Sequence, residues 1–470
     1  MITDKNRYFF CGIGGSGMLP LALILLDQGH IIEGSDRSLD QGRTPAKFDY
    51  LRSRGIRLFP QDGSGVTRPD QIVVASAAVE DSVPDIAAAI RVGAKRMSRA
   101  DMLSALFNAA PFTIGVAGTS GKSTVTGMIA WILHHAGRSP TVMNGAVMKN
   151  FRTPDALFSS SLVGTSGIFV SEVDESDGSI AAYNPRVAVL MNIALDHKTM
   201  DELRALFGGF AARAETVVLN LDNDETARMA GDFPEAITYS LDNPAAQLTA
   251  ADIVPAPTSI TFSVHDRTSG ASAAIRLATP GRHNVSNALA AIAAAMTCGV
   301  SLAEAAEALG AFTGIARRFD IVGTEGGVTV IDDFGHNPDK IAATLRTVSQ
   351  FPGRVLVMFQ PHGFGPLKKM RREFAECFAD NLDAEDVLLM PEPAYFGGTV
   401  DRSVGSGDLA ADIKAMGRSA EAPGDRPACA ARLIELARPG DRILVMGARD
   451  DTLTVFAQDL LTGLKARANA

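Results

Sequence analysis

A glycine-rich stretch from Gly115 to Thr124 constrains the fold of this chain more than any other feature of the sequence. It reads Gly-Val-Ala-Gly-Thr-Ser-Gly-Lys-Ser-Thr. Residues 112–114 have the pattern of a buried strand, and residues 125–136 place apolar side chains on one face of a helix. In such a turn, free backbone N–H groups and the positive end of the helix dipole point at one place. The stretch therefore predicts a site for nucleotide phosphates.

The residues of this loop follow a shortened form of the phosphate-loop motif. The longer pattern would need glycine at position 116, where the chain has Val116. The shorter form consists of Gly118, Thr119, Ser120, Gly121, Lys122, Ser123 and Thr124. Lys122 would add a full charge for the outer phosphates, and the Ser123 hydroxyl is placed to hold a magnesium ion. The alternative is a glycine-rich turn with a surface lysine, which the strand before it and the helix after it disfavour.

A second glycine-rich turn lies near the N-terminus. It follows an apolar stretch at 8–11 and contains the sequence Gly12, Ile13, Gly14, Gly15, Ser16 and Gly17. A helix is predicted over 18–28, and a strand over 30–36 that ends at Asp36. This arrangement is typical of a diphosphate bound at a helix N-terminus. Taken alone, it would favour a dinucleotide-binding fold and an NAD-dependent oxidoreductase.

The length and the order of predicted elements indicate several α/β domains. A chain of 470 residues is too long to form a single hydrophobic core, because domains average roughly 100–200 residues. Apolar strands alternate with helices throughout, which favours mostly parallel sheets covered on both faces. Residues 253–277 instead alternate in polarity and predict a small antiparallel addition. We expect three domains, at 1–110, 111–315 and 316–470, in which the first and second each carry a phosphate-type loop.

Charge and cysteine content limit the partners and the compartment that we expect. A net charge of −9 argues against nucleic acid as a general partner. The four cysteines are scattered without a C-x-x-C pair, which suits a reducing cytosol. The apolar run at 19–26 is too short to span a bilayer. We therefore expect a cytoplasmic protein without membrane insertion, either a monomer or a homodimer.

Clusters of polar residues at predicted strand ends are candidates for the chemistry. Residues 171–177, Ser-Glu-Val-Asp-Glu-Ser-Asp, follow one apolar strand, and 192–197, Asn-Ile-Ala-Leu-Asp-His, follow another. Ligands of open α/β sheets gather at this edge, and clustered acids repel one another unless cations balance them. The first cluster therefore predicts a magnesium site, against the alternative of a solvated acidic loop. Further polar motifs occur at 282–287, 317–319 and 332–338.

In order and spacing, these motifs resemble the Mur ligase family. They are Gly118 to Thr124, Glu172 to Asp177, Asn192 to His197, His283-Asn284, Arg317-Arg318-Phe319 and Asp332 to Pro338. Gly12 to Gly17, Gly34-Ser35-Asp36 and Gln360-Pro361-His362 are most similar to the family's ligases that join L-alanine to UDP-N-acetylmuramate. The related ligase that recycles a murein tripeptide is also similar. The resemblance implies a Rossmann-like UDP-binding domain, a central ATPase domain and a C-terminal Rossmann-like domain.

The resemblance also implies a reaction, its cofactors and residue roles. The reaction would be ATP-dependent amide formation through an acyl phosphate in peptidoglycan precursor synthesis, with ATP and Mg²⁺, on a UDP-sugar carboxylate and an amino acid or peptide. Lys122 would hold the β- and γ-phosphates, and Ser123, Glu172 and His197 would bind magnesium. Asn284 would meet adenine, Asp333 the ribose and Arg318 the γ-phosphate. The loop Gly12, Gly14, Gly15, Ser16, Gly17, with Asp36, would hold the UDP part. Lys122, His197, Arg318 and His336 are the candidate catalytic residues, and a site drawn from three domains implies closure on substrate binding.

The chain departs from the alanine ligases at four places. Ser120 replaces a histidine, His336-Asn337 replaces two histidines, and the segment after His197 is altered. The fourth departure is at Gly363 and Pro366, where those ligases carry arginines that bind the carboxylate of the incoming amino acid. Two lost charge-assisted contacts forfeit roughly 1.5–3 kcal/mol each. This predicts an altered amine pocket, for which Arg371 and Arg372 are the nearest replacements.

Two further classes of function compete with the ligase. A non-catalytic UDP-sugar-binding regulator would explain the lost arginines, but it has no need of Lys122, Ser123, Glu172, His197, Arg318 and Asp333 together. A small-molecule kinase would share the phosphate loop, but it would not need the C-terminal domain. The amine substrate and the identity of the sugar nucleotide stay open at this point.

Overall fold

The computed structural model describes residues 5–76, 79–195, 198–395, 401–448, 450 and 452–468. The chain divides into two compact units. Unit 1 consists of Met1–Val254, Ile260–Ala278 and His283–Gly314, and unit 2 consists of Pro255–Ser259, Thr279–Arg282 and Ile315–Ala470. The three-domain division at residues 110 and 315 stays a prediction. Among the described residues, no helix is both long and apolar enough to cross a membrane.

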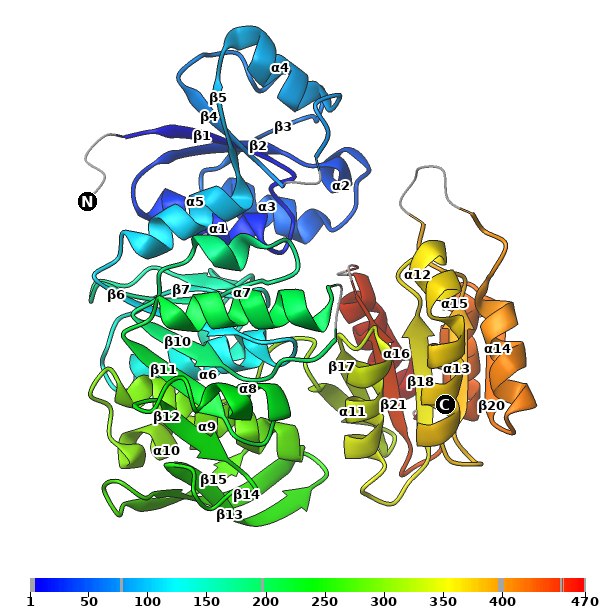
Figure 1. The fold of residues 1–470 in the computed structure, drawn as a ribbon. Coiled ribbons are helices and arrows are strands. Elements are labelled where there is room, and N and C mark those ends of the chain that lie inside the picture. Colours follow the sequence, from blue (N-terminus) through cyan, green and yellow to red (C-terminus); the bar gives the residue numbers. More distant parts are fainter. Residues whose placement is uncertain are drawn as a thin grey trace. The chain divides into compact units, whose positions relative to one another are not determined.

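Unit 1 begins with a parallel five-stranded sheet in the order β3-β2-β1-β4-β5 (Figure 1). The strand order reverses beside β1, and ligands of open α/β sheets bind at such a switch point. The strands are β1 (Arg7–Cys11), β2 (Ile31–Ser35), β3 (Arg57–Phe59), β4 (Gln71–Ala75) and β5 (Lys95–Ser98). The helices are α1 (Met18–Asp27), α2 (Arg37–Asp40), α3 (Pro45–Ser53), α4 (Pro84–Val92) and α5 (Arg99–Asn108). The first glycine-rich turn lies between β1 and α1, at the switch point.

The second sheet of unit 1 has ten strands in the order β15-β14-β13-β12-β11-β10-β6-β9-β7-β8. The strands are β6 (Phe112–Ala117), β7 (Thr141–Met143), β8 (Ser161–Leu162), β9 (Ile168–Glu172), β10 (Val187–Leu190), β11 (Thr216–Asn220), β12 (Ile237–Ser240), β13 (Leu248–Ala256), β14 (Ser259–Asp266) and β15 (Ser272–Leu277). The helices are α6 (Lys122–His135), α7 (Met200–Ala212), α8 (Asp224–Met229), α9 (Arg282–Met296) and α10 (Leu302–Gly310). Strand β6 pairs in parallel with β10 and β9, while β14 and β15 are antiparallel, as the alternating pattern predicts.

The two sheets of unit 1 share a hydrophobic core. Phe107 of α5 packs edge-on against Phe169 of β9 and against Tyr183, with ring centroids 5.7 and 5.2 Å apart. Tyr50 of α3 contacts the ring of Phe158 at 5.4 Å. These side chains belong to one buried cluster that spans both sheets. Burial of aromatic rings from both layers therefore helps to hold the first glycine-rich turn and the phosphate loop within one compact unit.

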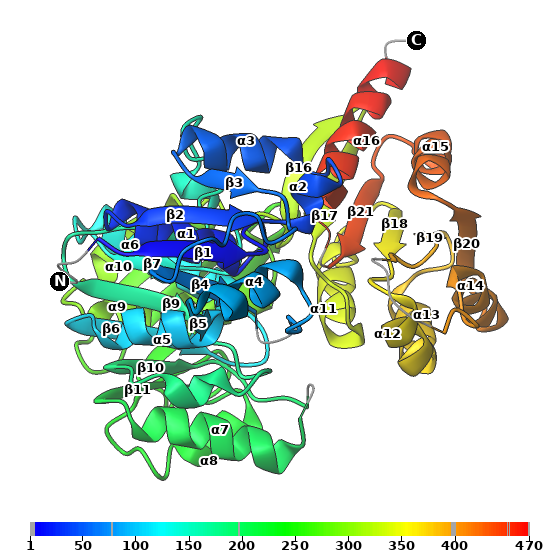
Figure 2. The same cartoon turned by 90° about the horizontal axis from the view of Figure 1, so that it is seen from above.

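Unit 2 contains a six-stranded sheet in the order β16-β17-β21-β18-β19-β20, in which only the β16–β17 pair is antiparallel (Figure 2). The strands are β16 (Asp320–Glu325), β17 (Val328–Asp333), β18 (Val355–Gln360), β19 (Val387–Pro391), β20 (Ser419–Gly424) and β21 (Arg442–Gly447). The helices are α11 (Pro338–Val348), α12 (Phe364–Lys369), α13 (Arg371–Asn381), α14 (Ser406–Ala415), α15 (Arg426–Leu436) and α16 (Thr452–Ala468). Buried apolar clusters cover both faces of the sheet.

One predicted helix of unit 2 is wrong in its extent. The sequence favours a helix over 368–379, but the structure has two helices, α12 and α13, that meet at Met370. Met370 has φ −115° and ψ 23°, outside the α-helical region. Leu367 of α12 and Phe374 of α13 are both buried in the core cluster beside β18. The helical pattern of residues 368–379 therefore does not predict the break at Met370.

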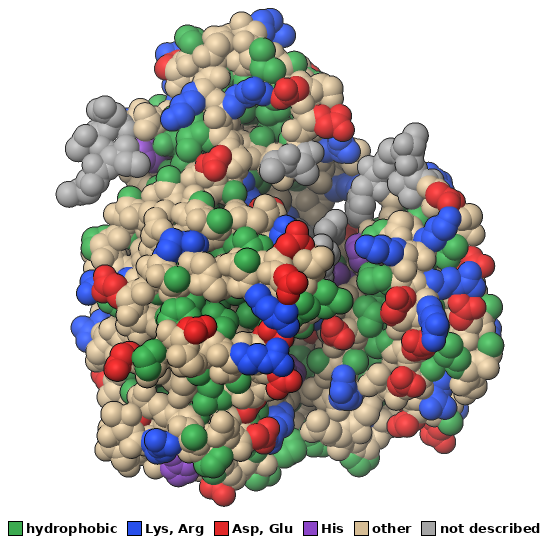
Figure 3. Space-filling view, viewed as in Figure 1, with side chains coloured by type: hydrophobic (Ala, Val, Ile, Leu, Met, Phe, Trp, Pro, Cys, Tyr) green, Lys and Arg blue, Asp and Glu red, His purple; other side chains and the backbone are tan. Residues whose placement is uncertain are grey.

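Charged side chains of both signs are interspersed on the face of the molecule drawn in Figure 3. The four cysteines Cys11, Cys298, Cys377 and Cys429 are all free thiols.

Candidate functional site

The phosphate loop joins β6 to the N-terminus of α6 and requires glycine at its last position. Gly121 has φ +90°. A Cβ atom there would lie 2.5 Å from Cε of Met191 and 2.8 Å from Oδ1 of Asn287. Both the backbone conformation and the lack of space therefore exclude a side chain. Val116, where the longer motif would have glycine, is fully buried inside β6, so the shorter motif is the one that forms the turn.

Asn192, at the end of β10, holds this loop in place. Its Oδ1 accepts a hydrogen bond from the Ser120 backbone N–H at 2.9 Å, and its Nδ2 donates to the Ser120 carbonyl at 3.0 Å. The Asn192 carbonyl also accepts from the Thr119 N–H at 3.0 Å. Asn192, which the sequence offered as part of a ligand set, thus positions the backbone that would bind phosphate. Asp196 and His197 lie outside the described residues, so the metal role of His197 stays a prediction.

Lys122 lies at the first turn of α6 and is held by two acceptors. Its Nζ donates to the Gly118 carbonyl at 2.7 Å and to Oε2 of Glu175 at 2.8 Å. The side chains of Lys122 and Glu175 are only 14% and 7% exposed. Burial lowers the pKa of Lys122, but the charges of Glu175 and Glu172 outweigh it and raise the pKa above its ordinary value. Lys122 is therefore a fixed positive charge beside the loop.

Ser123 and Glu172 provide adjacent oxygen atoms at the same end of the sheet. The Ser123 Oγ donates to Oε2 of Glu172 at 2.9 Å, and the Gly145 N–H donates to the same oxygen at 3.0 Å. Asn144, whose Nδ2 donates to the Ser123 carbonyl, has a buried Oδ1 without a hydrogen-bond partner. Hydroxyl, carboxylate and amide oxygens fit Mg²⁺, which prefers few protein oxygens together with phosphate and water. No group of three or more His, Cys, Asp or Glu side chains that could bind a metal is found within the described ranges.

The remaining acids of the 172–177 cluster are balanced by cations. Burial raises the pKa of Asp174, but the charge of Lys122 together with hydrogen bonds from Ser176 outweighs this effect and lowers the pKa. Asp177 pairs with Nη2 of Arg99 at 3.5 Å. The predicted cluster of acids thus forms around Lys122 and Arg99.

The first glycine-rich turn is held by two side chains from later in the chain. Oδ2 of Asp36 accepts from the Gly14 N–H at 2.8 Å, and Nζ of Lys47 donates to the Gly14 carbonyl at 3.0 Å. Asp36 also accepts from the Ser38 N–H at 2.7 Å and begins α2. Asp36 therefore positions the turn, and its predicted contact with a ligand remains a prediction. Lys47 is 8% exposed, and sequence reasoning did not find it.

Arg99 is a second cation at this turn that the motifs did not indicate. A Cβ atom on Gly17 would lie 3.1 Å from Cδ and 3.2 Å from Nη1 of Arg99. The arginine side chain therefore packs on Gly17 at the N-terminus of α1, and its other amino group reaches Asp177 in the acidic cluster. Arg99 is the first residue of α5, far from both loops in sequence, and only the fold brings the three together.

Asn284, the predicted adenine contact, is on α9. It is 5% exposed, and its Oδ1 accepts from Nδ2 of Asn287 at 3.1 Å. Asn287 in turn lies against Gly121 of the phosphate loop. The structure therefore places Asn284 close to the phosphate loop, and its contact with adenine stays a prediction.

In unit 2, Asp333 at the end of β17 has both carboxylate oxygens engaged. Oδ2 accepts from the Phe319 N–H at 2.8 Å, and Oδ1 accepts from the Gly335 N–H at 2.8 Å and from Oγ1 of Thr344 at 3.1 Å. These bonds fix the segment that begins with Arg317 and the loop after β17. The ribose contact predicted for Asp333 would be made in addition to these structural hydrogen bonds.

The paired arginines stack on one aromatic ring. The guanidinium carbons of Arg317 and Arg318 lie 5.2 and 4.3 Å from the ring centroid of Phe334. Arg317 has φ +60° and donates to Oδ1 of Asp332 and to the Gly447 carbonyl. Arg317 is therefore a buried structural residue, and Arg318 is the one whose phosphate role stays a prediction.

His336 packs against His362, with ring centroids 5.4 Å apart. Its Nδ1 is 3.0 Å from the Phe334 carbonyl. Burial, reinforced by the charge of Lys340, lowers the pKa of His336 to about 3. His336 is therefore neutral at physiological pH.

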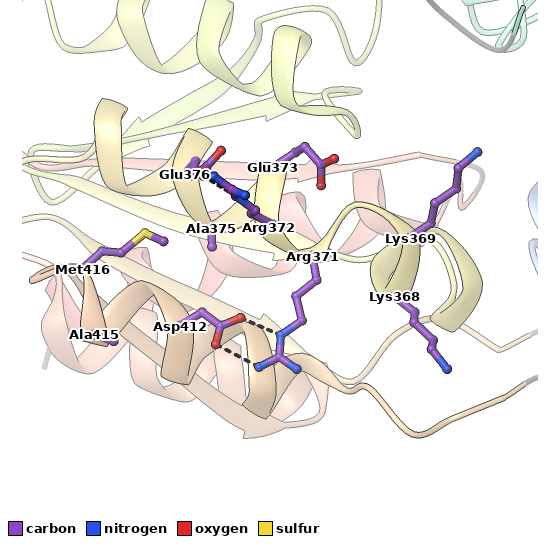
Figure 4. Close-up of a pocket in the computed structure, with 10 residues that line it drawn as sticks. All are labelled: Lys368, Lys369, Arg371, Arg372, Glu373, Ala375, Glu376, Asp412, Ala415 and Met416. Atoms are coloured by element: carbon purple, nitrogen blue, oxygen red, sulfur yellow. Dashed lines mark hydrogen bonds and ion pairs between the residues drawn. The ribbon is translucent and has the colours of Figure 1, made fainter.

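Arg371 and Arg372, expected to replace the lost arginines, are both paired with acids. Figure 4 shows Arg371 directed at Asp412 of α14, with Nε 2.5 Å and Nη2 2.8 Å from its two oxygens. Arg372 pairs with Glu376 at 2.7 Å. Both line a surface hollow of about 720 Å³ between α12, α13 and α14. Binding a substrate carboxylate there would first require breaking these pairs.

Comparisons with known proteins agree along the whole chain. Residues 7–110 match the Mur ligase family, catalytic domain, residues 116–295 the Mur ligase middle domain, and residues 317–449 the Mur ligase, glutamate ligase domain. A UDP-N-acetylmuramate–L-alanine ligase from a Synechococcus strain is 36% identical over 448 residues, which cover 94% of this chain and 84% of the relative. That of Rhizobium johnstonii is 34% identical over 478 residues, 98% of each chain.

Solved structures give the same result. The UDP-N-acetylmuramate-alanine ligase of Thermotoga maritima has a TM-score of 0.81 at 26% identity, covering 98% of this chain and 99% of that one. A murein peptide ligase of Psychrobacter arcticus has a TM-score of 0.72 at 26% identity, with the same coverage.

Proposed function

Because this chain belongs to the Mur ligase family, we propose that it is an ATP-dependent ligase that joins the carboxylate of a UDP-N-acetylmuramate-type sugar nucleotide to the amino group of an amino acid. The observation that carries the proposal is the phosphate loop, in which Lys122 is fixed by Glu175 and Ser123 contacts Glu172. This arrangement lies within a chain that aligns almost end to end with alanine ligases.

The chemistry proceeds in two steps. The sugar carboxylate attacks the γ-phosphorus of ATP, and ADP leaves as an acyl phosphate forms. The amine nitrogen then attacks the acyl carbon, and inorganic phosphate leaves as the amide forms. Both steps concentrate negative charge, so positioning and charge neutralisation lower the barrier more than covalent participation of the protein does.

Residues at the phosphate loop provide this positioning and charge neutralisation. Lys122 and the backbone N–H groups of the loop would hold the β- and γ-phosphates. Ser123 and Glu172 would hold Mg²⁺, which neutralises phosphate charge when it is bound. Burial lowers the pKa of His336 to about 3, which keeps it neutral near neutral pH, and its catalytic role stays a prediction.

The test is ADP release with Mg²⁺, ATP and UDP-N-acetylmuramate across L-amino acids and murein peptides. Turnover with one amine, together with formation of the amide product by mass spectrometry, is the expected result. Turnover with a murein tripeptide alone would instead make the chain a recycling ligase, which the similarity to the murein peptide ligase favours as the second candidate. Binding of both nucleotides without turnover with any amine would contradict the proposal and support a regulator.

A further inference from the structure

Arg402 lies beside Phe364, the residue after Gly363, at the start of the helix that follows β18. The loop after β18 begins with Pro361, whose carbonyl accepts from the Ala394 N–H at 2.9 Å. A Cβ atom on Gly363 would lie 4.0 Å from the Ala394 carbonyl oxygen. The segment at 394–395 therefore runs alongside the place from which a side chain at 363 would extend.

The guanidinium of Arg402 rests on two aromatic rings at this place. Its Cζ is 3.8 Å from the ring centroid of Tyr395 and 5.7 Å from that of Phe364, the residue after Gly363. Contact with ring faces restrains the guanidinium plane but uses none of its five N–H donors. Among the residues that the structure describes, no carboxylate pairs with Arg402, in contrast to Arg371 and Arg372.

Both chain neighbours of Arg402 are anchored to α12. Nζ of Lys368 lies 2.5 Å from Oδ2 of Asp401 and 3.3 Å from Oγ of Ser403. The Ser403 N–H also donates to Oδ1 of Asp401 at 2.8 Å. Residues on either side of Arg402 are therefore tied to the helix that begins with Phe364, which fixes where the arginine side chain starts.

We propose that Arg402 binds the carboxylate of the incoming amino acid or peptide and so determines which amines this ligase accepts. The proposal rests on the ligase function proposed above. An amino-acid acceptor carries a carboxylate one carbon from its amine, and a planar guanidinium binds a carboxylate through two parallel hydrogen bonds. A guanidinium that is positioned by aromatic rings, with its donors available, is suited to that task. Amines without a carboxylate are then poor acceptors.

The kinetic test compares L-alanine, L-alaninamide and the tripeptide L-alanyl-γ-D-glutamyl-meso-diaminopimelate as acceptors. We expect Arg402→Ala to raise the KM of the carboxylate acceptor about 10- to 100-fold, with the KM of ATP and of UDP-N-acetylmuramate within about twofold. Arg402→Lys should recover only part of the loss, because an ammonium cannot form the two-bonded fork. The preference for L-alanine over L-alaninamide should disappear in Arg402→Ala. Arg438→Ala, which removes an exposed arginine after α15, is the matched control.

A labelling test decides the proposal even if turnover fails. Phenylglyoxal modifies accessible arginines, and peptide mass spectrometry locates the adduct. With UDP-N-acetylmuramate and a non-hydrolysable ATP analogue present, L-alanine or the tripeptide should slow labelling of Arg402 but not of the exposed Arg438, and L-alaninamide should slow neither. An unchanged KM in Arg402→Ala, or labelling of Arg402 that no carboxylate acceptor slows, would overturn the assignment. Absence of turnover with protection intact would instead count against the ligase function.

Discussion

The two glycine-rich turns of unit 1 obtain the positive charge for an anion site from different parts of the chain. Each follows a strand and opens a helix, at Gly17–Met18 and at Gly121–Lys122. The phosphate loop carries its cation within its own motif, as Lys122. The first turn has none, and its cations come from Lys47 of α3 and Arg99 of α5. The motif of the phosphate loop therefore predicts the cation of its anion site, whereas the motif of the first turn does not predict Lys47 and Arg99.

The acids near the two turns have pKa values shifted in opposite directions. Asp174, near the phosphate loop, has its pKa lowered by Lys122 against the effect of burial. Asp85, under the first turn, is fully buried and accepts from Oγ of Ser35 and from the Gly63 N–H. Burial raises the pKa of Asp85, because the hydrogen bonds it accepts do not compensate for lost hydration. The charge of Lys122 thus favours the ionised form of Asp174, whereas no cation is among the described groups that shift the pKa of Asp85.

The largest effect on activity is expected when Lys122, the cation within the phosphate loop, is removed. Lys122→Met should lower kcat for ADP release by about 10³-fold, because the developing phosphate charge loses its fixed partner. Lys95→Met, an exposed lysine of β5, is the control, and melting curves should show that the variant folds even though Glu175 loses its partner. Activity within tenfold of the wild type would show that the backbone of the loop suffices.

Removing Arg99 should affect a different kinetic constant. We expect Arg99→Ala to raise the KM for UDP-N-acetylmuramate about tenfold and to leave the KM for ATP nearly unchanged, because the arginine packs on Gly17 of the first turn. Arg96→Ala on β5, which breaks an exposed pair with Asp81, is the control. An equal rise in both KM values would mean that Arg99 acts through Asp177 and the acidic cluster instead.

A smaller effect is expected at Lys47, because its ammonium is bonded to the turn's own carbonyl. Lys47→Met keeps the length and apolar stem of the side chain, and should raise the KM for the sugar nucleotide about two- to fivefold. Steady-state kinetics at low and high salt would check this. If Lys47 serves only to hold Gly14, the salt dependence of KM will not change.

The smallest effect is on stability and depends on pH. The pKa of Asp85 is raised in the folded chain, so the folded state binds more protons than the unfolded one between the two pKa values, and the free energy of unfolding falls as pH rises through that window. Asp85→Asn should remove this penalty and raise the melting temperature by a few degrees at pH 8, with little change near pH 4. Calorimetry at both pH values tests this. A variant that is less stable than the wild type at pH 8 would show that Asp85 is ionised and needed.

Much of the fold was predictable because it depends on local pattern. The helix over 18–28 and the strand over 30–36 were predicted to within one residue at each end of α1 and β2, and the phosphate loop was identified with its strand and helix. The break between α12 and α13 was not predicted, since residues 368–379 have continuous helical propensity and no local pattern marks Met370. His197 lies outside the described residues, and the metal role predicted for it remains a prediction.

The sequence by itself determined the family, the α/β class and the residues that lie inside contiguous motifs. Lys122, Ser123 and Glu172 belong to that group, because a turn motif and a strand end place their side chains with little help from distant residues. Only the tertiary structure decided which distant side chains complete each site. It brought Arg99 to Gly17 and Lys47 to Gly14, paired Arg371 with Asp412, and left Arg402 on Tyr395 with its donors available. The physical reason is that charge partners are chosen by distance in space, which sequence separation does not fix.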